Sequence, residues 1–112
     1  MTMMKFEVYK GNNKEHYFKL VDDTGKTLLS SEGYKQKASV INGLESVKKN
    51  LPVTGNIEKK MSSDGRFFFN VKSGNGQVVG TSGMFDSPEL RDQWLIEMQR
   101  EVNNLQVTDT GN

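Results

Sequence analysis

Residues 16–34 read HYFKLVDDTGKTLLSSEGY, and residues 67–85 read FFFNVKSGNGQVVGTSGMF. The second stretch follows the first at an offset of 51 residues and aligns with it without a gap. Identical or similar residues recur in this register, among them Phe18 with Phe69, Gly25 with Gly76, Ser31 with Ser82 and Tyr34 with Phe85. Self-similarity at a fixed spacing indicates a repeated structural unit. We therefore predict two tandem copies of one unit.

The repeat register covers nearly the whole chain. It extends into a helical segment, after which the offset becomes 54 residues, so the second helix is expected to be about one turn longer. At 112 residues, the chain has the length of one domain. We predict a single domain over residues 1–112, with repeat 1 at about residues 4–54 and repeat 2 at about residues 56–109.

Each unit is predicted to hold three strands, a helix and a short final strand. Short patterned runs that are separated by Gly, Asn and Asp indicate strands joined by hairpin turns. The predicted strands cover residues 6–10, 16–21, 26–31 and 51–54 in repeat 1, and residues 57–61, 67–72, 77–82 and 105–108 in repeat 2. Asn75-Gly76 favours a type I′ turn, in which both central residues adopt positive φ.

Apolar residues at helical spacing predict one helix in each unit. They are Val40, Ile41, Leu44 and Val47 in repeat 1, and Leu90, Trp94, Leu95, Met98 and Val102 in repeat 2. Asp86 followed by Glu89 predicts a capping box at the start of the second helix. The first helix begins near Gln36, which is a poor cap.

A helix with one apolar stripe must bury it, and one face of a sheet is the natural place. We therefore predict an α+β fold: two tandem βββα(β) repeats share one antiparallel sheet, and both helices pack on one face. The other face is then open to water. Alternation assigns to the core His16, Phe18, Leu20, Phe67, Phe69 and Val71, and to the open face Tyr17, Lys19, Val21, Phe68, Asn70 and Lys72. A shift of one residue would exchange the two sets.

Gly43 lies on the apolar side of the first helix, at the position equivalent to Trp94 in the second. Glycine in a helix interior costs about 1 kcal/mol relative to alanine, which indicates a packing requirement. We predict that the helices lie side by side and that the indole of Trp94 fills the space at Gly43. A role for Trp94 in stacking on a ligand is the alternative.

Composition limits the classes of function. The chain has 15 Lys and Arg against 14 Asp and Glu, a balance that argues against a protein that coats nucleic acid or anionic membrane. The absence of cysteine excludes disulfides and thiol nucleophiles. No apolar run fits a signal peptide or a membrane span, so a cytoplasmic protein is expected.

Residues that could carry catalysis are few. His16 is the one histidine, so it lacks the additional ligands that a metal site needs. Glu7 and Glu58 are paired by the repeat and would be the carboxylates of an acid–base site, but alternation places both on the solvated face. Gly74-Asn75-Gly76 precedes a strand and lacks the helix N-terminus that holds phosphate. We predict no catalytic residue, no metal and no cofactor, and a protein that is not an enzyme.

The stretches Thr24–Tyr34 and Asn42–Asn50 resemble the bacterial YegP-like family, which is a domain of unknown function found as single copies or tandem pairs. The resemblance is close in repeat 1 and looser in repeat 2, where Ser82, Gly83 and Phe85 keep part of the pattern. It implies repeats of three strands and a helix that share one sheet and exchange their C-terminal strands. It also implies that a tandem chain is similar to a fused dimer and acts as a monomer.

Exposed aromatic residues on a half-covered sheet favour an interaction module, because clustered apolar surface tends to mark binding sites. The candidate interaction surface is Glu7, Tyr9, Tyr17, Glu58 and Phe68; its partner is left open, and a protein is one candidate. The first alternative is a small-molecule-binding protein or minor enzyme with a pocket between the repeats, including His16. The second is an RNA- or DNA-binding protein that stacks bases on Tyr9, Tyr17 and Phe68.

Overall fold

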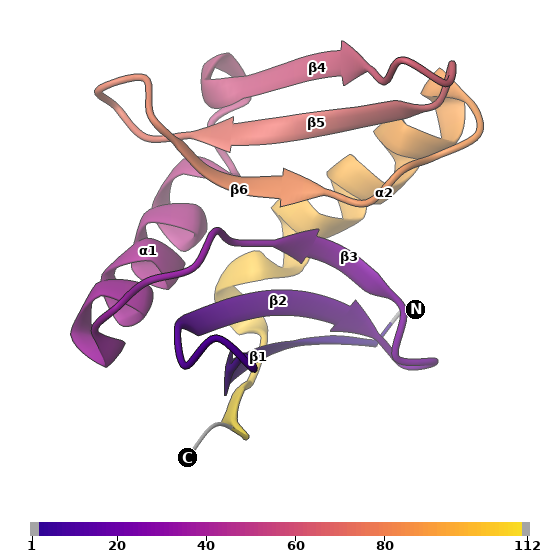
Figure 1. The fold of residues 1–112 in the computed structure, drawn as a ribbon. Coiled ribbons are helices and arrows are strands. Elements are labelled where there is room, and N and C mark those ends of the chain that lie inside the picture. The colour runs from indigo at the N-terminus through magenta and orange to yellow at the C-terminus, as the bar shows by residue number, and fades with distance from the viewer. Residues whose placement is uncertain (1–2, 111–112) are drawn as a thin grey trace.

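The computed structural model describes residues 3–110, which form a seven-stranded sheet with two helices on one face (Figure 1). Repeat 1 contributes β1 (Met4–Lys10), β2 (His16–Asp22), β3 (Thr27–Ser30) and α1 (Lys37–Asn50). A short 3₁₀ helix, η1 (Thr54–Asn56), leads into repeat 2. Repeat 2 contributes β4 (Ile57–Met61), β5 (Phe67–Lys72), β6 (Val78–Ser82), α2 (Pro88–Glu101), the 3₁₀ helix η2 (Val102–Asn104) and β7 (Val107–Asp109). The predicted α+β class is confirmed.

The strand order is β4-β5-β6-β3-β2-β1-β7. Each repeat forms a three-stranded meander, because short turns join consecutive antiparallel strands. The two meanders meet at the antiparallel pair β3 and β6, where Ser30 lies opposite Thr81. The repeats therefore share one sheet, as the sequence predicts.

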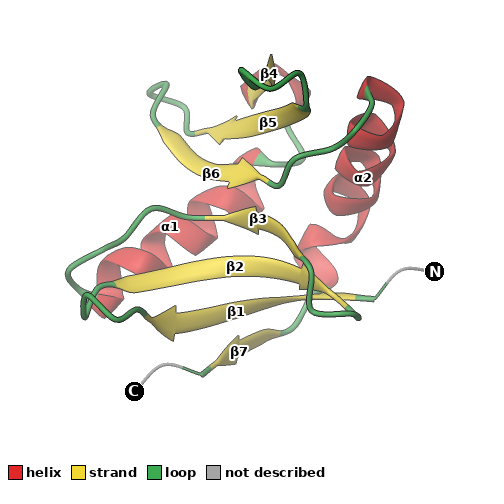
Figure 2. Cartoon of the chain, turned by 45° about the vertical axis from the view of Figure 1, so that its right-hand side comes forward, coloured by secondary structure: helices red, strands yellow, loops and turns green. Residues whose placement is uncertain are grey.

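β7 adds a parallel strand to this sheet. It lies beside β1, with Phe6 opposite Val107 and Val8 opposite Asp109 (Figure 2). The sheet is therefore mixed, which corrects the prediction of a wholly antiparallel one. The final strand of repeat 2 is exchanged onto repeat 1, in agreement with the predicted exchange.

The predicted strand at residues 51–54 does not form. Leu51 is fully buried and continues α1, since its N–H donates to the carbonyl oxygen of Val47 (2.8 Å). Pro52 has no N–H to donate to a strand ladder, and the chain then turns through η1 directly into β4. The exchange of final strands thus runs in one direction, from repeat 2 to repeat 1.

The core lies between the sheet and the helices. Its largest fully buried side chains include Phe6, Phe18, Leu20 and Phe69 from the sheet, and Val40, Leu44, Val47 and Met98 from the helices. His16 and Phe67, at the strand starts, are half-buried, so the core assignment holds best at the strand centres. Val21 is 2% exposed although alternation predicts the open face. The register of β2 against β3 shifts between Leu20 and Val21, which interrupts the alternation.

The β2–β3 and β5–β6 hairpin turns use one left-handed glycine each. Gly25 and Gly76 have φ of 87° and 86°, whereas Asn75 does not have positive φ. The N–H of Gly76 donates to Ser73 (2.9 Å) and that of Ser73 donates to Gln77 (2.8 Å). This pattern is a turn followed by a glycine bulge, so the type I′ prediction is wrong. A single glycine that accepts positive φ is enough to reverse the chain.

The structure confirms that α2 has a side-chain cap and that α1 has none, but the residue that caps α2 is not the predicted one. Ser87, not Asp86, caps α2: its backbone is extended and its Oγ accepts from the N–H of Leu90 (3.1 Å). Gln36 precedes α1 and makes no side-chain cap, as expected. No helix within residues 3–110 is long and apolar enough to cross a membrane.

The space at Gly43 is filled by Tyr34, not by Trp94. Tyr34 pairs with His16 just before α1 begins, and its ring lies against the buried glycine. Trp94 is half-buried and packs against the core from α2. The predicted contact was wrong because the residue that leads into α1 reaches Gly43 from within the same repeat.

Candidate interaction surface

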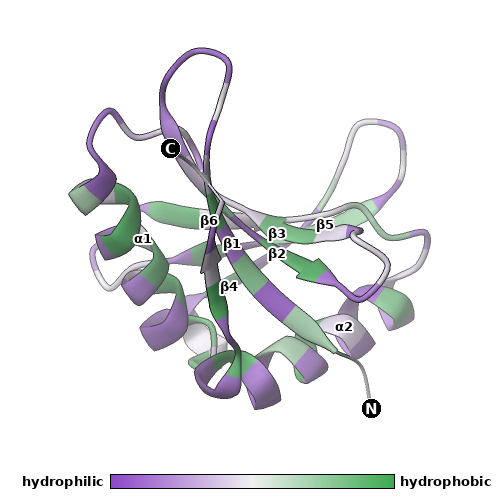
Figure 3. Ribbon diagram, turned by 90° about the horizontal axis from the view of Figure 1, so that it is seen from below, coloured by the Kyte–Doolittle hydropathy of each residue, from purple (hydrophilic) through white to green (hydrophobic). Residues whose placement is uncertain are grey.

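The face of the sheet opposite α1 and α2 is covered by no helix or strand within residues 3–110 (Figures 1 and 2). Hydrophilic and hydrophobic residues alternate along β1, as expected for a strand with one buried and one solvated face (Figure 3). The side chains on the open face are therefore available for contact with a partner.

One row of polar side chains crosses the open face on all seven strands. The strand registers place its members opposite one another in the order Glu58, Asn70, Thr81, Ser30, Lys19, Glu7 and Thr108. Residues opposite one another in a ladder project from the same side of the sheet. The row therefore joins both repeats, and Ser30 and Thr81 form its centre. We call it the polar row.

The repeat 1 half of the polar row is flanked by a tyrosine pair. The rings of Tyr9 and Tyr17 stack with centroids 5.5 Å apart and planes at 18°. Lys19 Nζ lies 5.0 Å from the Tyr9 ring centroid and 3.7 Å from Glu7 Oε1. Burial raises the pKa of Tyr9, and the neighbouring Tyr17 and Glu7 raise it further. The pair is thus a half-buried aromatic surface beside a cation.

In repeat 2, hydrogen bonds hold the polar row in place. Asn70 Nδ2 donates to Glu58 Oε1 (3.1 Å), and Thr81 Oγ1 donates to Asn70 Oδ1 (2.9 Å). Lys72 Nζ lies 3.0 Å from Glu58 Oε2. The hydrogen bond from Asn70, together with Lys72, lowers the pKa of Glu58. Glu58 is therefore ionised at neutral pH and does not suit the role of a general acid.

The predicted surface residues do not form a single cluster. Tyr9 and Tyr17 contact each other, whereas Phe68 lies on β5, beside Lys60 of β4. Three strand spacings separate β2 from β5, which is roughly 14 Å. The aromatic residues thus belong to two separate halves of the open face.

Glu7 and Glu58 are also far apart. They occupy the same polar row but lie on β1 and β4, separated by five strand spacings, or roughly 24 Å along the sheet. Carboxylates that share a glycoside-hydrolysis site lie about 5–10 Å apart. The two residues therefore do not form an acid–base pair within one chain.

His16 lies at the start of β2, where its backbone pairs with that of Tyr34. Its N–H donates to the carbonyl oxygen of Tyr34 (2.7 Å), and the N–H of Tyr34 donates back (2.8 Å). Phe67 and Phe85 make the equivalent backbone pair in repeat 2. Within residues 3–110, no group of three or more His, Cys, Asp or Glu side chains could hold a metal ion.

Hollows near the sheet include two that are lined by residues of the described range 3–110. One of about 240 Å³ lies between the repeats, where Ser30–Glu32 meets residues 78–81. The other, of about 680 Å³, lies where β1, the β2–β3 turn and residues 104–106 meet. Its Asp22 is already engaged, because Oδ1 accepts from the N–H groups of Thr24 and Lys26 (2.9 Å each).

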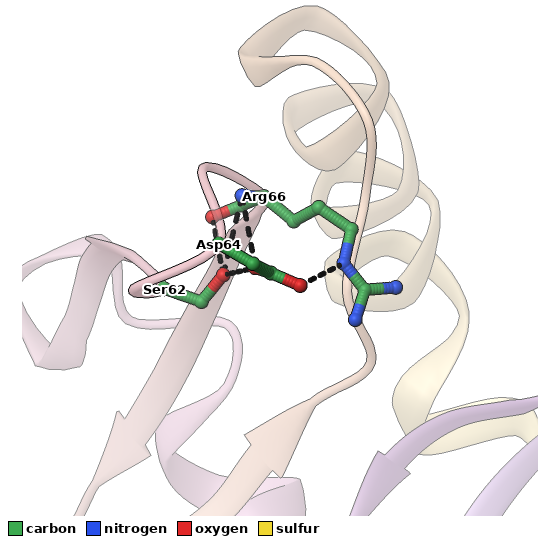
Figure 4. Close-up of polar contacts among 3 residues, drawn as sticks. All are labelled: Ser62, Asp64 and Arg66. Atoms are coloured by element: carbon green, nitrogen blue, oxygen red, sulfur yellow. Dashed lines mark hydrogen bonds and ion pairs between the residues drawn. The ribbon is translucent and has the colours of Figure 1, made fainter.

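The turn between β4 and β5 is held by a side-chain network (Figure 4). Asp64 accepts from Ser62 Oγ and from Arg66 Nε, the latter at 3.0 Å. The Ser62 hydroxyl and the Arg66 guanidinium lower the pKa of Asp64. The network orders the end of β4, which is the outermost strand of repeat 2.

The sequence interpretation missed Ser30 and Thr81 at the centre of the polar row. A signal for them exists, because the repeat register aligns Ser30 with Thr81. Their adjacency depends on the pairing of β3 with β6, which no local pattern specifies.

Comparison with known proteins extends these observations. The domain of unknown function DUF1508 matches the chain twice, at residues 12–58 and 62–94. A UPF0339 protein encoded upstream of the ptx operon of Stutzerimonas stutzeri is 41% identical over 107 residues, which cover 96% of each chain. The UPF0339 protein YegP of Escherichia coli is 34% identical over 104 residues, which cover 93% of this chain and 94% of the relative.

Two solution NMR structures share the fold. The UPF0339 protein from Shewanella oneidensis has a TM-score of 0.88 and 30% identity, covering 96% of this chain and 92% of its own. The yegP protein from E. coli, described as a protein of unknown function, has a TM-score of 0.88 and 31% identity, covering 100% of this chain and 97% of its own. The chain therefore belongs to the YegP-like family of DUF1508 proteins, with the family domain matched in both of its repeats.

Proposed function

We propose that this protein is a non-enzymatic interaction module that binds a partner protein with the open face of its sheet. The observation that carries the proposal is the polar row, which crosses all seven strands on a face that no helix or strand within residues 3–110 covers. Hydrogen bonds and ion pairs hold the side chains of Glu58, Asn70, Thr81, Lys19 and Glu7 in place before a partner arrives. Preorganisation of this kind lowers the entropy lost on binding.

The charge arrangement favours a protein over a nucleic acid. Glu58 has Lys72 and Lys60 within 4.0 Å, and Glu7 lies within ion-pair distance of Lys5 and Lys19. These six groups carry a net charge of only +2, and the two carboxylates would repel phosphates. Nucleic-acid affinity depends largely on unopposed Lys and Arg. Adjacent charges of both signs suit the mixed polar surface of a protein.

The module is proposed to act as a monomer in the cytoplasm. The pairing of β3 with β6 already joins two equivalent repeats inside one chain, which supports a monomeric state. Light scattering over a range of concentrations tests that state, and cell fractionation tests the location.

The test of the proposal is an amide NMR fingerprint of the labelled chain, recorded with the protein, nucleic-acid and small-molecule fractions of a bacterial extract. We expect the protein fraction to shift amides of β1, β2 and β5 next to the polar row. The variants Tyr17→Ala and Phe68→Ala remove equivalent residues of the two halves and are expected to weaken these shifts. Ile96→Ala serves as the control, because Ile96 is 54% exposed and lies on α2.

Other results would point elsewhere. Shifts at residues 30–32 and 78–81 with the small-molecule fraction would favour a ligand in the hollow between the repeats. Shifts with the nucleic-acid fraction alone would contradict the choice of partner. Shifts that persist in both aromatic variants would remove the open face from the proposal.

A further inference from the structure

The two repeats differ at their outer edges. β1 and β4 are equivalent first strands, and each is the outermost strand of its own meander. β7 covers the outer edge of β1, but β4 is the last strand of the sheet, and no segment within residues 3–110 pairs with its outer edge (Figure 1). The near-symmetry of the fold therefore leaves one strand position vacant. An exposed edge presents unpaired N–H and C=O groups that can pair with another chain.

The occupied edge shows how a segment docks on such a strand. The N–H of Phe6 donates to the carbonyl oxygen of Gln106 (2.9 Å), and the N–H of Thr110 donates to that of Val8 (2.8 Å). Thr108 lies opposite Glu7 in the parallel register. The side chain of Asp109, opposite Val8, forms an ion pair with Lys37 of α1. Backbone pairing and a charged contact thus contribute to holding this segment.

β4 presents the same backbone pattern. Ile57 pairs with Val71 and Lys59 with Phe69, as Phe6 pairs with Leu20 and Val8 with Phe18 in repeat 1. The Ile57 N–H already donates to the carbonyl oxygen of Thr54. By equivalence with β1, the carbonyl of Ile57 and both backbone groups of Lys59 point away from the sheet, where a further strand would pair.

The chain's own equivalent of β7 does not reach this edge. That segment would be residues 51–54, but Leu51 is fully buried at the end of α1 and η1 runs straight into β4. Occupation of the vacant position therefore requires a segment from outside the fold.

The charges on β4 select the occupant. The side chains of Lys59 and Lys60 are 45% and 48% exposed, and Lys59 Nζ lies 3.2 Å from Asp92 Oδ1. Lysines on an edge strand disfavour pairing with apolar or basic segments. In the register of β7, an acidic residue would lie opposite Lys59, and the residue two positions before it would lie opposite the half-buried Ile57.

We propose that the outer edge of β4 docks an extended segment of a partner protein, which adds to the sheet as a parallel strand and carries an apolar residue followed two positions later by an acidic one. Strand addition of this kind gains affinity from backbone hydrogen bonds and specificity from alternate side chains. The proposal goes beyond binding by the open face, since it requires backbone groups at the edge and none of the polar row.

The test uses the full-length chain and a synthetic peptide with the sequence of residues 103–110, NNLQVTDT, because that segment already occupies the equivalent edge. In NMR titrations we expect shifts confined to Ile57–Met61 and the adjoining β5, together with slower hydrogen exchange of the Lys59 amide. Replacement of the peptide's aspartate by lysine should weaken binding about tenfold or more, since it removes a charge-assisted contact. Methylation of the backbone nitrogen at the threonine that precedes this aspartate should abolish binding, because that N–H would pair with the Ile57 carbonyl.

The variant Lys59→Glu should weaken binding similarly, whereas Lys49→Glu, on the exposed side of α1, makes the same charge change without effect. The fingerprint of each variant reports whether it is folded. The proposal is overturned if millimolar peptide leaves β4 unshifted, if the methylated peptide binds equally well, or if the peptide shifts β1 by displacing β7. Shifts of β4 that grow with protein concentration in the absence of peptide would overturn it in favour of a second copy at this edge.

Discussion

A Cβ atom placed on Gly43 would lie 2.6 Å from the hydroxyl oxygen of Tyr34 and 3.4 Å from the Phe18 ring. Gly43 is buried in the middle of α1, and Tyr34 joins the edge of β2 to the start of that helix. The glycine therefore sets how closely α1 approaches the strand beside it. In repeat 2, the equivalent positions hold Trp94 and Phe85. There the large helix residue occurs together with an aromatic ring that has no hydroxyl group.

The first prediction concerns this contact. Gly43→Ala should destabilise the protein, since overpacking costs about 1–3 kcal/mol and the gain in helix propensity offsets only about 1 kcal/mol of it. In a Tyr34→Phe background the nearest atom is gone, and the penalty should fall by about 1 kcal/mol. Urea unfolding of the two single variants and the double variant measures the difference. Equal penalties in both backgrounds would show that the hydroxyl does not limit the space.

The second prediction compares equivalent serines. Ser82 Oγ accepts from the N–H of Phe69 and Ser31 Oγ from that of Phe18, both at 2.9 Å. Ser82 is buried, whereas Ser31 is half-buried. Ser82→Ala leaves a buried N–H unpaired and should cost about 1–3 kcal/mol. Ser31→Ala should cost less because water can replace the hydroxyl. A larger loss for Ser31→Ala in denaturant unfolding would contradict this ranking.

The third prediction concerns Glu58. Its pKa should lie below the ordinary glutamate value, because Asn70 and Lys72 stabilise the carboxylate. The corresponding stability is present at neutral pH and is lost as the pH falls through the lowered pKa, below the unfolded value of about 4.3. Asn70→Ala should raise the pKa of Glu58 and reduce this acid sensitivity. An NMR titration of the Glu58 side-chain carboxyl carbon measures the pKa in the unmodified protein and in the variant. An unchanged pKa in the variant would exclude Asn70 as the cause.

The fourth prediction concerns Tyr9. Burial and the proximity of Tyr17 and Glu7 raise its pKa in the folded protein. Tyr17→Ala exposes the ring and removes one neighbour, so the pKa of Tyr9 should fall towards the ordinary tyrosine value of about 10. Ultraviolet titration at alkaline pH measures the change, with Tyr34→Phe as the background that removes the other tyrosine of raised pKa. A pKa of Tyr9 that does not move would mean that the stacked pair does not set it.

Much of the fold could be predicted from local patterns. Alternation around Phe18 and Phe69 identified the buried side of two strands, and apolar spacing identified both helices, because these periodicities belong to the elements themselves. Two of the errors arose at element ends. Leu51 was assigned to a strand but continues α1, and Ser87 caps α2 in place of Asp86. At such positions burial of a single side chain or one hydrogen bond decides between alternatives of similar local propensity.

The candidate surface was predictable only in part. Tyr9 and Tyr17 project from the open face, and the register of β1 against β2 brings them together. Phe68 shares the face but not the cluster, because two strands lie between β2 and β5. Alternation specifies the side of a sheet on which a residue lies, but not its neighbours on that side.

By itself, the sequence determined the repeat, the two kinds of element within it and the side of the sheet that β2 and β5 bury, because these depend on contacts or periodicities short in sequence. The tertiary structure alone decided that β3 joins β6, that β7 lies parallel to β1 and that β4 keeps an unpaired edge within residues 3–110. Pairings between distant segments depend on how the whole core is buried at once, and the connection through η1 is too short to cover β4. The polar row and the vacant edge are both consequences of that long-range pairing.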